Sequence, residues 1–214
     1  CRGTASPADW PFSQIPVWQL VRLQTDRLPC VCVDQEKVGK LAAGRLLASG
    51  RKEPAILIGD RTLSLHRDRL KGFLEALREA GMPLDQIRII DSSAPDEDGC
   101  RVTRQLLSDS PTVDSIFAAS DMQALGVMRT LLISQVPVPD RIAVIGVDNM
   151  GIGELCTPSI TCIRQPLQEI GRLACSRLIK AIMARPCKTA LQSVRSERFE
   201  PERLACELFA GETA

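Results

Sequence analysis

Five aspartates follow short apolar runs along the chain, and their placement is what most suggests chemistry. They are Asp34, Asp60, Asp91, Asp121 and Asp148. Such runs are typical of strands buried in a parallel sheet, and these sheets bind ligands at the carboxyl ends of their strands. A carboxylate there can accept hydrogen bonds from a ligand, or it can cap the following helix by accepting a backbone N–H. Both interpretations stay open for each of the five.

Asp121 and Asp148 differ in the residues on their C-terminal side. Asp121 directly precedes a helical pattern that begins at Met122, so it is the best candidate for an N-cap. Asp148 ends the run IAVIGVD and precedes MGIGELCTPSIT, whose two glycines and proline predict a loop. We therefore expect Asp148 to be the aspartate most available to a ligand.

Groups for covalent, acid–base or metal chemistry are sparse. The single histidine, His66, lies in the polar stretch SLHRDR, which predicts a solvated surface, and neither GxGxxG nor a P-loop occurs. Of nine cysteines only Cys30 and Cys32 are closely spaced, without the pairing a zinc site needs. Cysteines such as Cys162 and Cys175 lie in apolar contexts and should pack as reduced thiols. We expect no enzymatic activity, no metal, no cofactor and a cytoplasmic location.

Composition excludes other classes of function. The 214 residues carry 27 Lys and Arg against 26 Asp and Glu, so no bulk positive charge draws the chain to nucleic acid or anionic lipid. Aromatic residues make up only 3%, with no tyrosine, so a ligand would be recognised by hydrogen bonds more than by stacking. No stretch approaches the roughly 20 apolar residues of a membrane span. The chain opens without Met or a visible signal peptide, and we expect it to be the C-terminal part of a longer protein.

Strand and helix patterns alternate through the middle of the chain, which predicts an α/β fold with parallel sheets. The predicted strands are 15–22, 29–34, 55–60, 87–91, 115–121 and 142–148, and the predicted helices 36–49, 70–81, 98–109 and 122–134. A β-like segment at 158–166, a long amphipathic helix at 167–183 and an edge strand at 190–200 complete the pattern.

Four segments in this order and spacing resemble the effector-binding domains of the LacI/GalR family of bacterial transcription regulators. They are RDRLKGFLEAL (67–77), SIFAASDMQALGVMRTL (115–131), VPVPDRIAVIGVDNM (136–150) and TPSITCIRQPLQEIG (157–171). The resemblance implies a two-lobed, periplasmic-binding-protein-like (type I) fold that clamps a ligand. It places residues 1–52 and 159–185 in a truncated N-terminal lobe, and 53–158 and 186–214 in the C-terminal lobe.

The resemblance also implies which side chains contact the ligand. The arginine of the R-x-x-G-F pattern can fork onto neighbouring hydroxyls or a carboxylate, although a surface or lobe-bridging salt bridge is the alternative. The family usually has an Asn-Asp pair after the apolar strand of the second segment, and here a serine replaces the amide. The implied ligand-binding residues are Arg69, Asp148, Asp121, Ser120, Asp34 and Gln165.

The resemblance further implies a function. This chain would be the sugar-sensing part of a LacI-type regulator, a homodimer whose operator DNA is bound by a helix-turn-helix outside this sequence. The helix LGVMRTLLI (125–133) offers apolar surface for the dimer. The alternative is a periplasmic sugar-binding protein of an ABC transporter, which has the same fold. Nine cysteines and few aromatic residues favour the regulator.

Overall fold

A computed structural model of the protein describes residues 19–20, 29–92, 95–183 and 200–214. Their contacts divide the chain into two compact units. The smaller consists of Cys1–Cys32 and Leu167–Leu204, and the larger of Val33–Pro166 and Ala205–Ala214. The chain therefore passes from one unit to the other three times.

The larger unit is built on a six-stranded sheet with the strand order β3-β2-β4-β5-β6-β8. Its strands are β2 (Pro54–Ile58), β3 (Arg88–Asp91), β4 (Ser115–Ala118), β5 (Ala143–Asp148), β6 (Thr161–Arg164) and β8 (Glu207–Phe209). All neighbouring pairs are parallel except β6 and β8. The predicted α/β class is thus confirmed.

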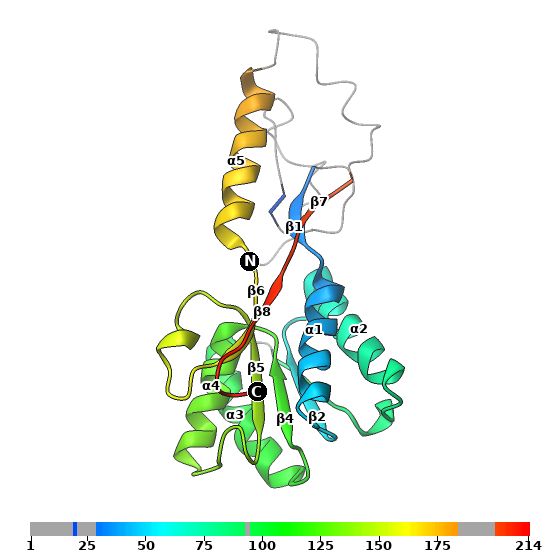
Figure 1. The fold of residues 1–214 in the computed structure, drawn as a ribbon, viewed down its shortest axis with the longest axis vertical. Helices are drawn as coiled ribbons and strands as arrows, with labels where there is room; N and C mark the ends of the chain where they lie inside the picture. The colour runs from blue at the N-terminus through cyan, green and yellow to red at the C-terminus, as the bar shows by residue number, and fades with distance from the viewer. Residues whose placement is uncertain (1–18, 21–28, 93–94, 184–199) are drawn as a thin grey trace. The chain divides into compact units, whose positions relative to one another are not determined.

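One α-helix precedes β2, and three α-helices and two short 3-10 helices connect the strands from β2 to β6 (Figure 1). The α-helices are α1 (Gln35–Ala48), α2 (Ser64–Glu79), α3 (Pro95–Asp109) and α4 (Asp121–Ile133). The 3-10 helices are η2 (Leu84–Gln86) and η3 (Gly153–Leu155). The predicted alternation of strands and helices is confirmed, with boundaries that shift by a few residues.

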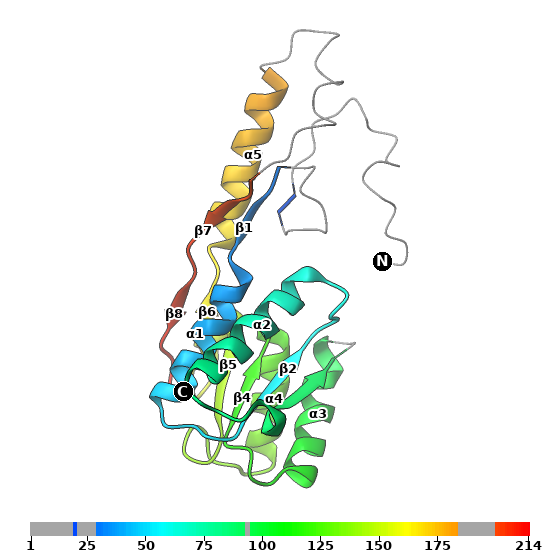
Figure 2. The same cartoon turned by 90° about the vertical axis from the view of Figure 1, so that its right-hand side faces the viewer.

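The sheet has a helical layer on each face. Successive side chains of a strand point to opposite sides, so a strand that is apolar throughout needs helices on both faces. Ile116 of β4 belongs to a buried cluster with Val102 and Leu106 of α3 and Val127 of α4. Phe117, the next residue, stacks on Phe73 of α2 with ring centroids 5.1 Å apart. Helices α3 and α4 therefore cover one face, and α1 and α2 the other (Figure 2).

Two glycines allow α1 and α2 to cross at very short range. A Cβ on Gly39 would lie 2.1 Å from the carbonyl oxygen of Arg69, and one on Gly72 would lie 1.9 Å from that of Glu36.

The two compact units have other boundaries than the expected lobes. Because α1 packs on α2, residues 33–52 join the larger unit instead of the one assigned to the N-terminal lobe. Residues 159–166 join it too, since β6 is a strand of its sheet.

The smaller unit contains α5 (Leu167–Met183), whose bounds match the predicted helix. Strand β1 (Val31–Val33) pairs with β7 (Glu202–Leu204), and Arg177 of α5 forms an ion pair with Glu202 at 3.1 Å. The predicted strands 15–22 and 190–200 lie almost wholly outside the described residues. Cys175 is exposed on α5, so the prediction that it packs as a buried thiol is wrong. Among the described helices, none has the length and apolar character needed to cross a membrane.

Candidate ligand-binding site

Polar side chains converge at the carboxyl edge of the six-stranded sheet. Strands β4, β5 and β6 are parallel neighbours, so the residues that follow them lie side by side. These are Ala119 after β4, Asp148 at the end of β5 and Gln165 after β6. Helix α1 begins at this edge with Gln35, and α2 contributes Arg69.

Arg69 is at the centre of this group, and its side chain is almost completely buried (5% exposed). Its Nη1 donates to the carbonyl oxygen of Ala119 at 2.5 Å, and its Nε donates to Oε1 of Gln35 at 2.7 Å. Its Nη2 lies 3.9 Å from Oδ1 of Asp148. Burial lowers the pKa of the guanidinium, and the negative charge of Asp148 opposes that shift. The cation is thus held in place by neutral acceptors as well as by a carboxylate.

Two glutamine amides complete a ring between the arginine and the aspartate. Gln35 donates through Nε2 to Oε1 of Gln165 at 3.0 Å, and Gln165 donates through Nε2 to Oδ1 of Asp148. The hydrogen bonds thus run in one direction, from the Arg69 guanidinium through the two amides to the Asp148 carboxylate. We call Arg69, Gln35, Gln165 and Asp148 the polar ring.

The structure therefore brings together three of the residues that the resemblance implied, Arg69, Asp148 and Gln165. Gln35 was not predicted from the sequence, although it directly follows Asp34 at the same edge of the sheet. The Asp148 side chain keeps 24% of its surface exposed, so one group of the ring is open to a ligand.

The other three implied residues lie at the same edge but have partners in the backbone. Ser120 is the N-cap of α4 and accepts from the N–H of Gln123 at 3.2 Å, so the prediction that Asp121 is that cap is wrong. Asp121 is the first residue of α4 instead, and its carboxylate accepts from backbone N–H groups of the loop after β5. Asp34 caps α1 by accepting from the N–H of Lys37 at 3.1 Å. For Asp34 the capping interpretation therefore holds.

His66 lies near the polar ring, contrary to the prediction of a solvated surface. Its side chain is half-buried against the backbone of Gly59, where an added Cβ would lie 2.5 Å from Nε2. Burial and the positive charge of Arg69 lower the pKa of His66, while Asp60 and Asp148 oppose that shift. Its Nδ1 is buried without a hydrogen-bond partner. Burial beside Arg69 therefore favours the neutral imidazole over the charged one.

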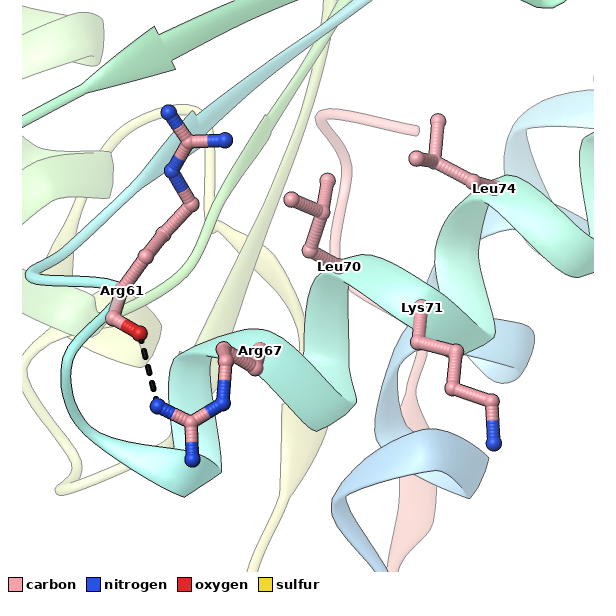
Figure 3. Close-up of a pocket in the computed structure, with 5 residues that line it drawn as sticks. All are labelled: Arg61, Arg67, Leu70, Lys71 and Leu74. Carbon is pink, nitrogen blue, oxygen red and sulfur yellow. Dashed lines mark hydrogen bonds between the residues drawn. The ribbon is translucent and has the colours of Figure 1, made fainter.

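A separate hollow of about 450 Å³ lies along α2 (Figure 3). Its three cations are already engaged: Arg67 donates to the carbonyl oxygen of Arg61 at 2.9 Å, Lys71 pairs with Glu36 at 2.7 Å, and Arg61 pairs with Asp91. None of the six implied ligand residues lines it; its lining residues are Arg61, Arg67, Leu70, Lys71 and Leu74. The hollow is distinct from the polar ring.

The groups of the ring are suited to forming hydrogen bonds. The ring offers a fork of donors at Arg69, an acceptor at Asp148 and two amides that can do either, which suits a ligand rich in hydroxyl groups. Within the described part of the chain, no three His, Cys, Asp or Glu side chains lie close enough together to hold a metal ion.

Comparison with known families agrees with this architecture. A family model described as the periplasmic binding protein-like domain matches residues 31–203. The chain belongs to this family. Curated relatives of this periplasmic-binding-protein-like chain include the ribose operon repressor of Halalkalibacterium halodurans, 30% identical over 82% of the chain. They also include the transcriptional regulator CelR of Thermobifida fusca, 31% identical over 85%.

The chain spans about half the length of these two relatives, 52% and 50% respectively. Solved structures point to the same group of proteins. A LacI family regulator from Enterococcus faecium with bound ribose matches with a TM-score of 0.78 at 25% identity, covering 90% of this chain and 67% of that one. A complex of CelR with cellobiose matches with a TM-score of 0.77 at 26% identity, covering 92% and 57%. The resemblance to LacI-type regulators is thus confirmed, and these relatives are named as regulators of transcription, not as enzymes.

Proposed function

We propose that this chain is the ligand-sensing domain of a LacI-type transcription regulator, and that it binds a sugar or sugar derivative at the polar ring. The observation that carries the proposal is the ring itself, with Arg69 and Asp148 at the carboxyl edge of the sheet. Relatives solved with ribose and with cellobiose support a sugar as the class of ligand.

The hydrogen-bonding groups of the ring are of the kinds that bind sugar hydroxyls. Arg69 donates to two neutral acceptors and only approaches Asp148, so the arginine and the carboxylate do not saturate each other. Adjacent sugar hydroxyls both donate and accept, and they can replace the amide contacts without leaving a buried group unpaired. A ligand without hydroxyl groups would lack these replacements and should bind poorly.

The partners of the whole protein are part of the same proposal. We infer that it is a cytoplasmic homodimer and that a segment outside this sequence binds operator DNA. Exposed apolar side chains at the end of α4, Leu132 and Ile133, support a contact with a second copy. The transporter alternative is less favoured, because the relatives from Halalkalibacterium halodurans and Thermobifida fusca are a repressor and a regulator.

A thermal-shift screen of the intact protein against a sugar panel that includes ribose and cellobiose tests the proposal. We expect at least one sugar to raise the melting temperature of the wild type and to have little effect on Asp148→Ala. The matched control is Asp91→Ala, because Asp91 also ends a strand but pairs with Arg61 outside the ring. Equal stabilisation of the wild type and Asp148→Ala would contradict the site.

A further inference from the structure

The loop that carries Asp148 has a backbone conformation that L-amino acids rarely adopt. Asp148 has a φ of +98° and Asn149 a φ of +56°. The second value is in the left-handed region that asparagine tolerates, but the first is outside it. Because such a conformation is costly, contacts from the rest of the fold must hold it.

Asp121 supplies two of those contacts, beside the hydrogen bonds from Asn149 Nδ2 to Glu154 and from the N–H of Gln165 to the Asp148 carbonyl oxygen. Its Oδ1 accepts from the N–H of Asn149 at 3.2 Å, and its Oδ2 accepts from the N–H of Met150 at 2.7 Å. The side chain is only 6% exposed. Both oxygens of one carboxylate thus bind the two N–H groups that follow Asp148.

Gly146 of β5 faces the first turn of α4 at close range. A Cβ at Gly146 would lie 3.1 Å from the Cβ of Ala124, one turn along α4 from Asp121. A side chain at Gly146 would be crowded against α4, so that one of the two would have to shift by a few tenths of an ångström. The first turn of α4 also favours a negative charge through the helix dipole.

Burial makes a charged group at this position costly, and the pKa of Asp121 is raised mainly by that burial, with Asp148 adding to the shift. The two backbone N–H donors oppose it. An uncharged side chain would avoid the cost of burying a charge. Only a carboxylate, however, has two acceptor oxygens for the two neighbouring N–H groups. The hydrogen bonds from Asn149 and Met150 therefore indicate that the Asp121 carboxylate holds the loop.

We infer that Asp121 is a positioning residue for the ligand site: its carboxylate fixes the Asp148–Met150 backbone in the conformation that presents Asp148 to Arg69. This role replaces the direct ligand contact that the resemblance implied for Asp121. The inference rests on the proposed function only in that the site binds a ligand. The effect of Asp121 on the Asp148–Arg69 pair is measurable without a ligand.

The test uses the full chain and compares Asp121→Asn with Ser120→Ala. Ser120 caps the same helix through the N–H of Gln123, which is part of α4 and not of the loop, so it controls for loss of helix stability. The asparagine keeps one acceptor and turns an N–H₂ donor toward the other backbone N–H. We expect amide hydrogen exchange at Asn149 and Met150 to accelerate at least tenfold in Asp121→Asn and to change little in Ser120→Ala.

A second readout separates positioning of Asp148 from general loop stability. A double-mutant cycle with Arg69→Gln and Asp148→Asn, followed by chemical unfolding, gives the coupling between the pair. We expect the coupling to vanish in the Asp121→Asn background and to persist in the Ser120→Ala background. Coupling that survives in Asp121→Asn would overturn the inference, even if exchange at the loop were faster.

A measurement on the wild type covers the case in which Asp121→Asn does not fold. The amide chemical shifts of Asn149 and Met150 should titrate together with the Asp121 carboxyl group, because both N–H groups donate to it. Shifts that do not follow Asp121 would refute the inference. If the loop behaves as expected but no sugar binds the wild type, the proposed function fails and the positioning role of Asp121 stands.

Discussion

Nη2 of Arg69 lies 3.9 Å from Oδ1 of Asp148, and the amides of Gln35 and Gln165 join the same two side chains by hydrogen bonds. A bidentate arginine–carboxylate pair would satisfy both groups directly. Here the direct contact between the two groups is long, and they are linked mainly by hydrogen bonds through the two amides. The arginine and the carboxylate consequently keep hydrogen-bonding capacity that the ring itself does not use.

Replacing Gln35 tests the integrity of the ring. Gln35→Ala leaves Nε of Arg69 and Oε1 of Gln165 without their partner in a largely buried place. We expect the free energy of unfolding to fall by about 1–3 kcal/mol, the usual cost of an unsatisfied buried group. Urea unfolding measures it, with the exposed Gln86→Ala as the control that should change little. Equal stability of the two variants would show that the ring contributes nothing to the fold.

His66 should make stability depend on pH near neutrality. Its pKa is lowered from 6.5 in the folded protein, mainly by burial, so the unfolded chain binds this proton more readily. Above the ordinary value both states are neutral and the group has no effect. As the pH falls below 6.5 the unfolded state gains protons first, and the free energy of unfolding should decrease.

Since His66 is the only histidine, its replacement isolates this effect. Unfolding of the wild type and His66→Gln should be compared between about pH 7.5 and 5.5, above the range in which ordinary carboxyl groups titrate. We expect the decrease to be smaller in His66→Gln. Identical pH profiles would mean that the imidazole is solvated, as its polar neighbours in sequence suggest.

Replacing either of two glycines of α1 by alanine should change the stability of the fold in opposite directions. Gly39→Ala places a methyl group against the Arg69 carbonyl, where the backbone cannot move aside without separating α1 from α2. We expect a loss of at least about 3 kcal/mol, beyond the usual range for overpacking. Gly44, on the same helix, has open space around its Cβ position, so Gly44→Ala should stabilise by about 0.5–1 kcal/mol. Thermal unfolding of both variants checks the helix crossing.

The proposed dimer depends on the end of α4. Ile133 is 72% exposed, so Ile133→Glu should leave the folded chain intact while placing a charge in the proposed contact. We expect sedimentation of the intact protein to show a dimer for the wild type and a larger monomer fraction for the variant. Leu63→Glu, at another exposed apolar residue, serves as control. A wild type that is monomeric at micromolar concentration would contradict the dimer.

The strand-terminal aspartates show how far the sequence leads and where it stops. Apolar runs locate the strands, and parallel order then requires that Asp148 and Gln165 meet at one edge. The choice between Ser120 and Asp121 as the cap of α4 depends on a one-residue shift of the helix start, which a periodic pattern does not resolve.

Gln35 and His66 were missed for different physical reasons. Gln35 begins a helix, and its role arises from Arg69, 34 residues away in sequence, which local spacing cannot reveal. His66 has polar neighbours in sequence, and it is half-buried because Gly59, the residue after β2, has no side chain to exclude it. In both cases a tertiary contact outweighs the local pattern.

The most direct test of the ligand site is calorimetric titration of the intact protein with the sugar that gives the largest thermal shift. We predict measurable binding to the wild type and to Asp91→Asn, and at least tenfold weaker binding to Asp148→Asn. Tenfold corresponds to about 1.4 kcal/mol, within the range expected when one partner of a buried hydrogen bond is lost. Equal affinity of Asp148→Asn and the wild type would contradict the proposal that the polar ring binds the ligand.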